Sequence, residues 1–175
     1  MQQGWVGTLI SAQVDGTALT AVGPASLLPA AAKVTIPNNF FAIGSALRIK
    51  ASGRISSLIT TPGTARFDVR LGGTVVFDGL AIHLDTVAAH TTVGWWLEIL
   101  LTCRAIGATG NFMGQGVWTC EDILGVPATA PKGVLSAMLP WNSAPTVGGN
   151  VDTTTALQLD LQFTQTVTKI GRAHV

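Results

Sequence analysis

The segment that decides the fold is Trp95-Trp96-Leu97-Glu98-Ile99-Leu100-Leu101-Thr102-Cys103-Arg104. One face of an extended chain through it is wholly apolar and carries Trp95, Leu97, Ile99, Leu101 and Cys103. Side chains of a β-strand point alternately to its two faces, so this period of two predicts a strand with one face in a core. The segment Phe112–Cys120 alternates in the same way after the turn residues Gly107–Gly110. The two segments are therefore predicted to form a hairpin, with Gly114 and Gly116 leaving room for bulky neighbours such as Trp95.

The same alternation recurs along most of the chain, whereas helical spacing barely occurs. It is found in Ala46–Thr60, Thr64–Leu71, Thr74–Phe77 and Thr153–Thr168. The turn residues Thr61-Pro62-Gly63 predict that the first two of these segments form a hairpin.

About eight strands without a sustained helix predict an all-β fold, an antiparallel β-sandwich of jelly-roll-like type. Two loops rich in proline and glycine, about Gly79–Gly94 and Ile123–Asn150, are expected at the ends of the sandwich or on an interface. We expect one domain over residues 1–168, with about the first 30 residues forming an extended arm.

Charge is scarce and evenly divided. Charged residues make up 11% of the 175 residues, with 10 Lys plus Arg against 9 Asp plus Glu, where roughly 25% is typical. No patch of like charge occurs, so nucleic acid and membrane surfaces are not expected as main partners. So few charges cover a monomer poorly, which favours burial against other subunits.

The last residues are set aside from the fold. Ile170-Gly171-Arg172-Ala173-His174-Val175 is similar to the translation of a common sequencing adapter, ATC GGA AGA GCA CAC GTC. On this interpretation residues 169–175 are a non-native tail on a gene from environmental DNA. The natural protein is then expected to continue beyond Thr168, with a further strand that pairs beside Thr153–Thr168 or closes its sheet.

Cys103 and Cys120 are the only cysteines. In the predicted hairpin Cys103 faces a residue near Gly114 and Cys120 one near Leu97, which separates the two sulfurs by roughly 20 Å at 3.3 Å per residue. A disulfide needs Cα atoms within about 7 Å. Two buried free thiols are therefore predicted.

His83, Asp85 and His90 are the one group of residues with a metal-binding character. A His-x-Asp on a strand places both side chains on one face, and a second imidazole completes the triad that binds non-haem iron. Against a metal, His90 lies only five residues past Asp85 in a loop of small residues, so a polar surface loop is the favoured interpretation. Asp68 and Glu98 resemble a glycosidase pair of carboxylates, but neighbouring arginines favour ion pairing between strands.

Five tryptophans and no tyrosine raise the question of a sugar platform. Trp95 and Trp118 lie on faces with a core pattern. Only Trp96 and Trp141 are expected to be exposed and able to stack on a ligand.

Several segments carry a resemblance to a known family. They are Ile36-Pro37-Asn38-Asn39-Phe40-Phe41, Leu47–Ser56, Thr61–Thr64 leading into Phe67–Gly72, Trp96–Ile99, Leu101–Gly107 and Gly114–Gly116. In this order they resemble a family of small virion proteins of tailed bacteriophages that is frequent in environmental viral sequence. The resemblance implies a jelly-roll-like subunit that assembles on the phage particle as a capsid decoration, head-fibre or tail-associated protein. It also implies a homo-oligomer, with a homotrimer as the expected form, located in the virion and in the host cytoplasm during assembly.

The resemblance transfers no active-site residue, so we expect a structural protein without catalysis, cofactor or metal. Its partners would be copies of itself and phage capsid or tail proteins, through contacts in the loops 79–94 and 123–150. Two alternatives stay open. One is a cupin-like metal enzyme built on His83, Asp85 and His90, and the other is a carbohydrate-binding jelly-roll module that uses Trp96 or Trp141.

Overall fold

The computed structural model describes residues 7–59, 63–124, 134–167 and 171–174. These ranges contain a short 3₁₀ turn, η1 (Ala30–Ala32), and no α-helix. The strands are β1 (Gly23–Ser26), β2 (Thr35–Ile36), β3 (Ala46–Ser57), β4 (Thr64–Leu71), β5 (Thr74–Asp78), β6 (Ile82–His83), β7 (His90–Ala105), β8 (Gly110–Leu124), β9 (Val134–Leu139), β10 (Val147–Val151), β11 (Leu157–Gln165) and β12 (Gly171–His174).

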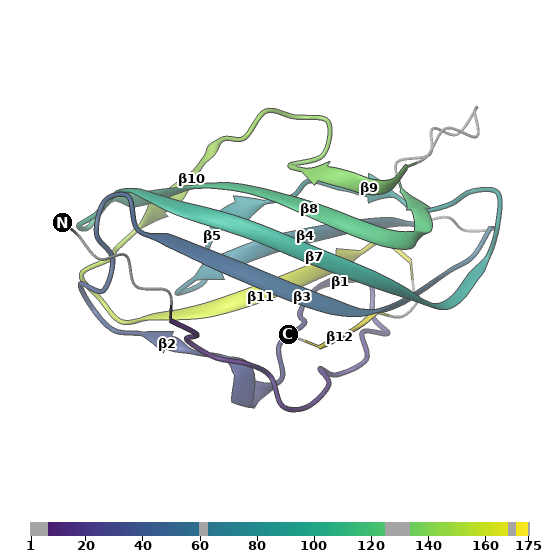
Figure 1. The fold of residues 1–175 in the computed structure, drawn as a ribbon, viewed down its shortest axis with the longest axis horizontal. Coiled ribbons are helices and arrows are strands. Elements are labelled where there is room, and N and C mark those ends of the chain that lie inside the picture. Colours follow the sequence, from purple (N-terminus) through teal and green to yellow (C-terminus); the bar gives the residue numbers. More distant parts are fainter. Residues whose placement is uncertain (1–6, 60–62, 125–133, 168–170, 175) are drawn as a thin grey trace.

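Two antiparallel sheets pack face to face (Figure 1). The β7 sheet has the order β10-β8-β7-β3-β12, with β9 also beside β8. The β11 sheet has the order β1-β11-β4-β5, with β2 beside β11 and β6 beside β4. The chain passes repeatedly from one sheet to the other, and the predicted all-β sandwich is confirmed.

The alternation found in the sequence sets which side chains enter the core. In β7 the side chains of Trp95, Leu97, Ile99, Leu101 and Cys103 are buried, while Trp96, Leu100 and Arg104 between them are exposed. The inner faces of β3, β4 and β11 contribute in the same way. Burial of these apolar faces, at roughly 25 cal/mol per Å², is the main force that holds the two sheets together.

The predicted hairpin of Trp95–Arg104 and Phe112–Cys120 is confirmed as β7 and β8, with a different register. Cys103 pairs with Phe112, and Cys120 with Trp95, which is two residues from the expected register. An irregularity between Cys103 and Ala105, where β7 carries one residue more than its partner, accounts for one of these two residues. The other arises at the turn, because Asn111 lies opposite Ala105. Both cysteines are buried and free, as predicted.

The predicted hairpin between Ala46–Thr60 and Thr64–Leu71 is wrong. β3 pairs with β7, whereas β4 pairs with β11 and β5 in the other sheet. A strand with one apolar face buries that face equally well in two arrangements. It can pair with the next strand of the sequence in one sheet, or pack against that strand from the opposite sheet. Alternation therefore finds the strands without finding their partners.

The loops predicted at about Gly79–Gly94 and Ile123–Asn150 contain strands. β6 lies in the first, and β9 and β10 lie in the second. At β10 the two sheets lie so close together that a Cβ atom at Gly148 would overlap the Val76 carbonyl group of β5. The glycines that suggested a loop therefore serve a close approach of two backbones.

The first described residues form little regular structure. In the expected arm, residues 7–22 form no strand apart from a single bridge at Leu19. The side-chain amide of Gln165 holds this arm by donating to the carbonyl oxygens of Leu19 (3.2 Å) and Ala21 (2.8 Å).

At the other end, β12 falls within the segment that resembles an adapter, and it pairs with β3 from Ser52 to Ile55. Among the described residues, β11 has β4 on one side and β1 and β2 on the other, so a further strand has no free edge beside β11. The alternative, a further strand that closes the sheet, stays a prediction.

Gly114 lies on the inner face of β8, where the Phe77 ring of the opposite sheet occupies the space that a side chain would need. The expected neighbour was Trp95, which instead lies across from Cys120. A Cβ atom at Gly114 would overlap the Phe77 ring and lie 2.8 Å from Leu101 Cδ2. By contrast, a Cβ atom at Gly94 on the outer face of β7 would meet only the Glu121 carboxylate, at 4.0 Å.

We expect Gly114→Ala to destabilise the protein by about 1–3 kcal/mol, because the Phe77 ring has to shift within a packed core. Gly94→Ala is the matched control and should change the free energy of unfolding by less than about 0.5 kcal/mol. Urea denaturation of both variants measures the difference. Equal stabilities would show that the contact between Gly114 and Phe77 is not tight.

Candidate functional site

The structure brings Asp85 and His90 together and leaves His83 apart. His90 Nε2 lies 3.0 Å from Asp85 Oδ2, and the Asp85 side chain is buried. His83 is exposed at the end of β6, between the buried residues Ile82 and Leu84. Strand geometry ends at His83, so the expectation that His83 and Asp85 share a face does not apply here. The described part of the chain contains no group of three or more His, Cys, Asp or Glu residues placed to hold a metal ion.

Asp85 organises the loop between β6 and β7. Burial raises the pKa of its carboxyl group, but hydrogen bonds from His90 and from the backbone N–H groups of Val87 and Ala88 outweigh burial and bring the pKa below its usual value. The Val87 N–H donates to Asp85 Oδ1 at 2.7 Å. The carboxylate thus ties the loop to the first residue of β7, which is a structural role.

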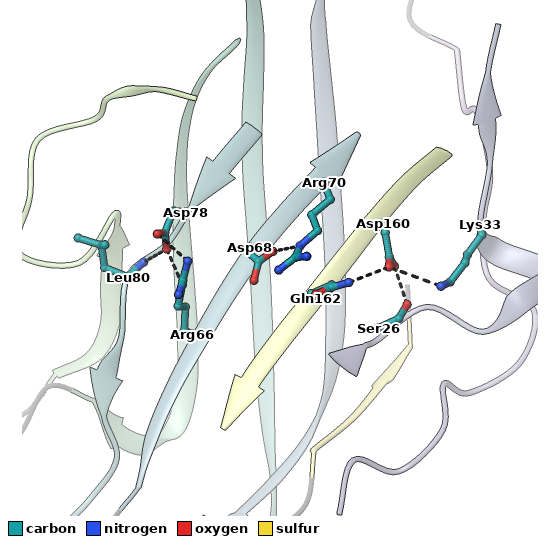
Figure 2. Close-up of polar contacts among 9 residues, drawn as sticks. All are labelled: Ser26, Lys33, Arg66, Asp68, Arg70, Asp78, Leu80, Asp160 and Gln162. Atoms are coloured by element: carbon teal, nitrogen blue, oxygen red, sulfur yellow. Dashed lines mark hydrogen bonds and ion pairs between the residues drawn. The ribbon is translucent and has the colours of Figure 1, made fainter. Parts of the chain in front are cut away.

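A row of charged side chains crosses the outer face of the β11 sheet (Figure 2). Arg66 donates two hydrogen bonds of 2.7 Å to Asp78, and Arg70 donates one of 2.7 Å to Asp68. Asp160 accepts hydrogen bonds from Ser26, Lys33 and Gln162. Each of the three carboxylates is therefore engaged by a cation. The contacts of Asp78 join β4 to β5, and the hydrogen bond between Ser26 and Asp160 joins β1 to β11.

Asp68 and Glu98, considered as a pair of catalytic carboxylates, lie on opposite outer faces of the sandwich. Glu98 on β7 lies 3.4 Å from Arg48 and 3.9 Å from Lys50 of β3. The prediction of ion pairing between strands is confirmed for Glu98, whereas the partner of Asp68 is on its own strand.

The outer face of the β7 sheet presents the most accessible tryptophan of the described residues. Trp96 is 46% exposed, and its partners in register are Ser52 on β3 and Thr119 on β8. Trp141 is partly buried and packs against the core, so only Trp96 has the exposure expected of a stacking residue. Trp95 and Trp118 are buried, as predicted.

Two residues before Trp96 on the same face, Gly94 leaves a gap where other residues carry a side chain. Arg54 of β3 is in register with Gly94 of β7, and the Gly94 N–H donates to Glu121 Oε2 of β8 at 3.1 Å. These three residues are not predicted from the sequence to lie together. The signal was a glycine two residues before the exposed Trp96, on the same face of one strand.

Exposed apolar side chains gather at one end of the sandwich. Phe40 (48% exposed) and Ile43 (69%) lie between β2 and β3, and Ile106 (49%) begins the turn after β7. The Gly44 N–H donates to the Cys103 carbonyl group (2.8 Å) and joins these two loops directly. Thr153 joins them a second time, because its carbonyl group accepts from the Asn39 N–H (2.9 Å) and its N–H donates to the Gly107 carbonyl group (3.0 Å). We call Phe40, Ile43 and Ile106 the end cluster. The sequence hinted at it with three bulky apolar residues in short loops, where polar residues are usual.

The fold and these surfaces define an all-β, antiparallel sandwich protein. No protein-family model matches the sequence, and no curated protein matches it either. Among solved structures, the chain is similar to the CBM2 module of the evolved Dit of Lactobacillus casei BL23 phage J-1. The two are 9% identical with a TM-score of 0.28, over 87% of this chain and 75% of that chain. This level of likeness assigns no function. Within the described ranges, no helix has the length and apolar character needed to cross a membrane.

We expect Asp85→Asn to lower the free energy of unfolding at neutral pH by about 1–3 kcal/mol, because buried donors lose a charged acceptor. The pKa of Asp85 is lower in the folded protein than in the unfolded chain, so its contribution is complete above the unfolded value of about 3.9. The contribution is lost as the pH falls through the lower, folded pKa.

Urea denaturation between pH 7 and pH 2 measures this effect. The stabilities of the wild type and Asp85→Asn should converge at the acidic end. A difference that stays constant with pH would contradict the role of the ionised carboxylate.

Proposed function

We propose that this protein is a non-enzymatic structural subunit of a tailed-phage virion, which associates with copies of itself and docks on capsid or tail proteins. The order of motifs from Ile36 onward supports the phage assignment, as described above. The proposed locations are the virion and, during assembly, the host cytoplasm. A homotrimer is the proposed form.

The observation that carries self-association is the end cluster. Ile43 is 69% exposed, and Phe40 and Ile106 are exposed beside it. Only 11% of the residues of the chain are charged. Contiguous apolar surface on a soluble protein marks contact sites. An interface there would shield side chains that the fold itself leaves uncovered.

The metal-enzyme alternative gains no support from the positions of its residues. His83 is exposed, while Asp85 is buried and engaged by His90 and the loop backbone. The structure offers a specific observation only for the carbohydrate alternative, at Trp96.

We expect the purified protein to be an oligomer at micromolar concentration and the double variant Ile43→Asp with Ile106→Asp to be a monomer. Two carboxylates in the interface would be desolvated without a partner, which costs more than the interface gains. Size-exclusion chromatography with light scattering measures both masses.

Val22→Asp is the matched control, because Val22 is 57% exposed and lies outside the end cluster. This control should remain oligomeric. Val87→Asp tests the loop 79–94, in which contacts were predicted from the sequence and where Val87 is 63% exposed. A wild-type monomer would contradict the proposed function, and dissociation by Val87→Asp alone would move the interface to that loop.

A further inference from the structure

The gap at Gly94 is bounded by three side chains of different chemical kinds. Gly94 and Trp96 lie two residues apart on the outer face of β7, so the indole of Trp96 stands beside an unfilled position. Arg54 flanks the gap from β3, and Glu121 flanks it from β8. By contrast, the positions next to Gly114 and Gly148 are filled by atoms of the opposite sheet.

Small residues leave the indole accessible. The partners of Trp96 in register are Ser52 and Thr119, whose side chains are too short to cover a ring of that size. The hydroxyl of Thr119 lies 3.1 Å from that of Ser136 on β9, which extends the polar surface away from the gap. The exposed indole of Trp96 therefore offers a flat apolar surface, and the hydroxyl groups of Ser52 and Thr119 border it on both sides.

Charges of both signs lie around the gap. Arg54 contributes one positive charge and Glu121 one negative charge, and Asp15 lies 3.7 Å from the Arg54 guanidinium. A bound anion would be repelled by Glu121, and a bound cation by Arg54. A neutral ligand with several hydroxyl groups can bind both side chains, because a hydroxyl group donates to the Glu121 carboxylate and accepts from the Arg54 guanidinium.

We propose that Trp96, Gly94, Arg54 and Glu121 form a binding site for a neutral pyranose sugar, presented as a residue of a polysaccharide. The apolar C–H face of the sugar ring stacks on the indole of Trp96, and its edge enters the gap over Gly94. Neighbouring hydroxyl groups of the ring bind the Arg54 guanidinium and the Glu121 carboxylate. This binding function goes beyond the proposed structural role and does not depend on the end cluster.

The experiment uses the purified protein in its native oligomeric state. It is applied to immobilised oligosaccharides of glucose, galactose, mannose, rhamnose and N-acetylglucosamine, with sialyllactose as an anionic probe. The best ligand is then titrated by calorimetry. We expect binding to a neutral oligosaccharide, and a loss of about tenfold or more in affinity for Trp96→Ala, because stacking on the ring is removed.

Two further variants test the gap and its polar border. Gly94→Leu fills the gap without deleting a polar side chain, and only the Glu121 carboxylate lies as close as 4.0 Å to a Cβ atom at this position. It should abolish binding. Glu121→Gln keeps the shape of the side chain but removes its charge, and it should weaken binding several-fold.

Leu100→Ala is the matched control, because Leu100 is 43% exposed on the same face of β7, four residues beyond Trp96. It should bind as the wild type does. Melting temperatures of all variants separate loss of binding from loss of fold. The proposal is overturned if the wild type retains no neutral saccharide, if sialyllactose is the preferred ligand, or if folded Trp96→Ala or Gly94→Leu binds normally.

Discussion

The contact of the Phe67 ring with both sheets is the interaction on which the rest of the sandwich depends. Phe67 on β4 packs against Phe163 on β11 within its own sheet, with ring centroids 5.0 Å apart. It also packs against Trp95 (5.3 Å) and Trp118 (5.0 Å) of the β7 sheet. Such aromatic pairs contribute about 0.5–1.5 kcal/mol each beyond the area they bury. The four rings set the separation of the two layers, and the indole N–H of Trp118 stays buried without a hydrogen-bond partner among the described residues.

Away from these rings, glycine lets the layers converge. Gly114 admits the Phe77 ring, and Gly148 admits the backbone of β5 at Val76. The sandwich is therefore wide where aromatic rings fill it and narrow at its β5 and β10 side. Charges stay on the two outer faces, where they pair with one another, so the core contains almost only apolar groups.

The sequence predicts the strands of this protein better than their partners. Alternation identifies the inner faces of β3, β4, β7, β8 and β11, because an apolar face has to be buried in any β-sandwich. It does not separate pairing from packing, which is why β3 and β4 were placed in one hairpin. The exposure of Trp96 follows from the same alternation, whereas the row of Arg54, Gly94 and Glu121 depends on the register of three strands. The separation of His83 from Asp85 depends on where β6 ends, and the sequence carries no clear signal for that end.

The pairing of β4 with β11 has a consequence for the order of folding. β4 is synthesised early, and β7, β8, β9 and β10 follow before β11 emerges. Contacts between such distant residues slow folding, because a long loop has to close before they form. Until β11 is made, one edge of β4 has no partner, and Phe67 lacks its contact with Phe163. The nascent chain therefore carries an open edge of β4 through most of its synthesis, and the core closes only after β11 has been made.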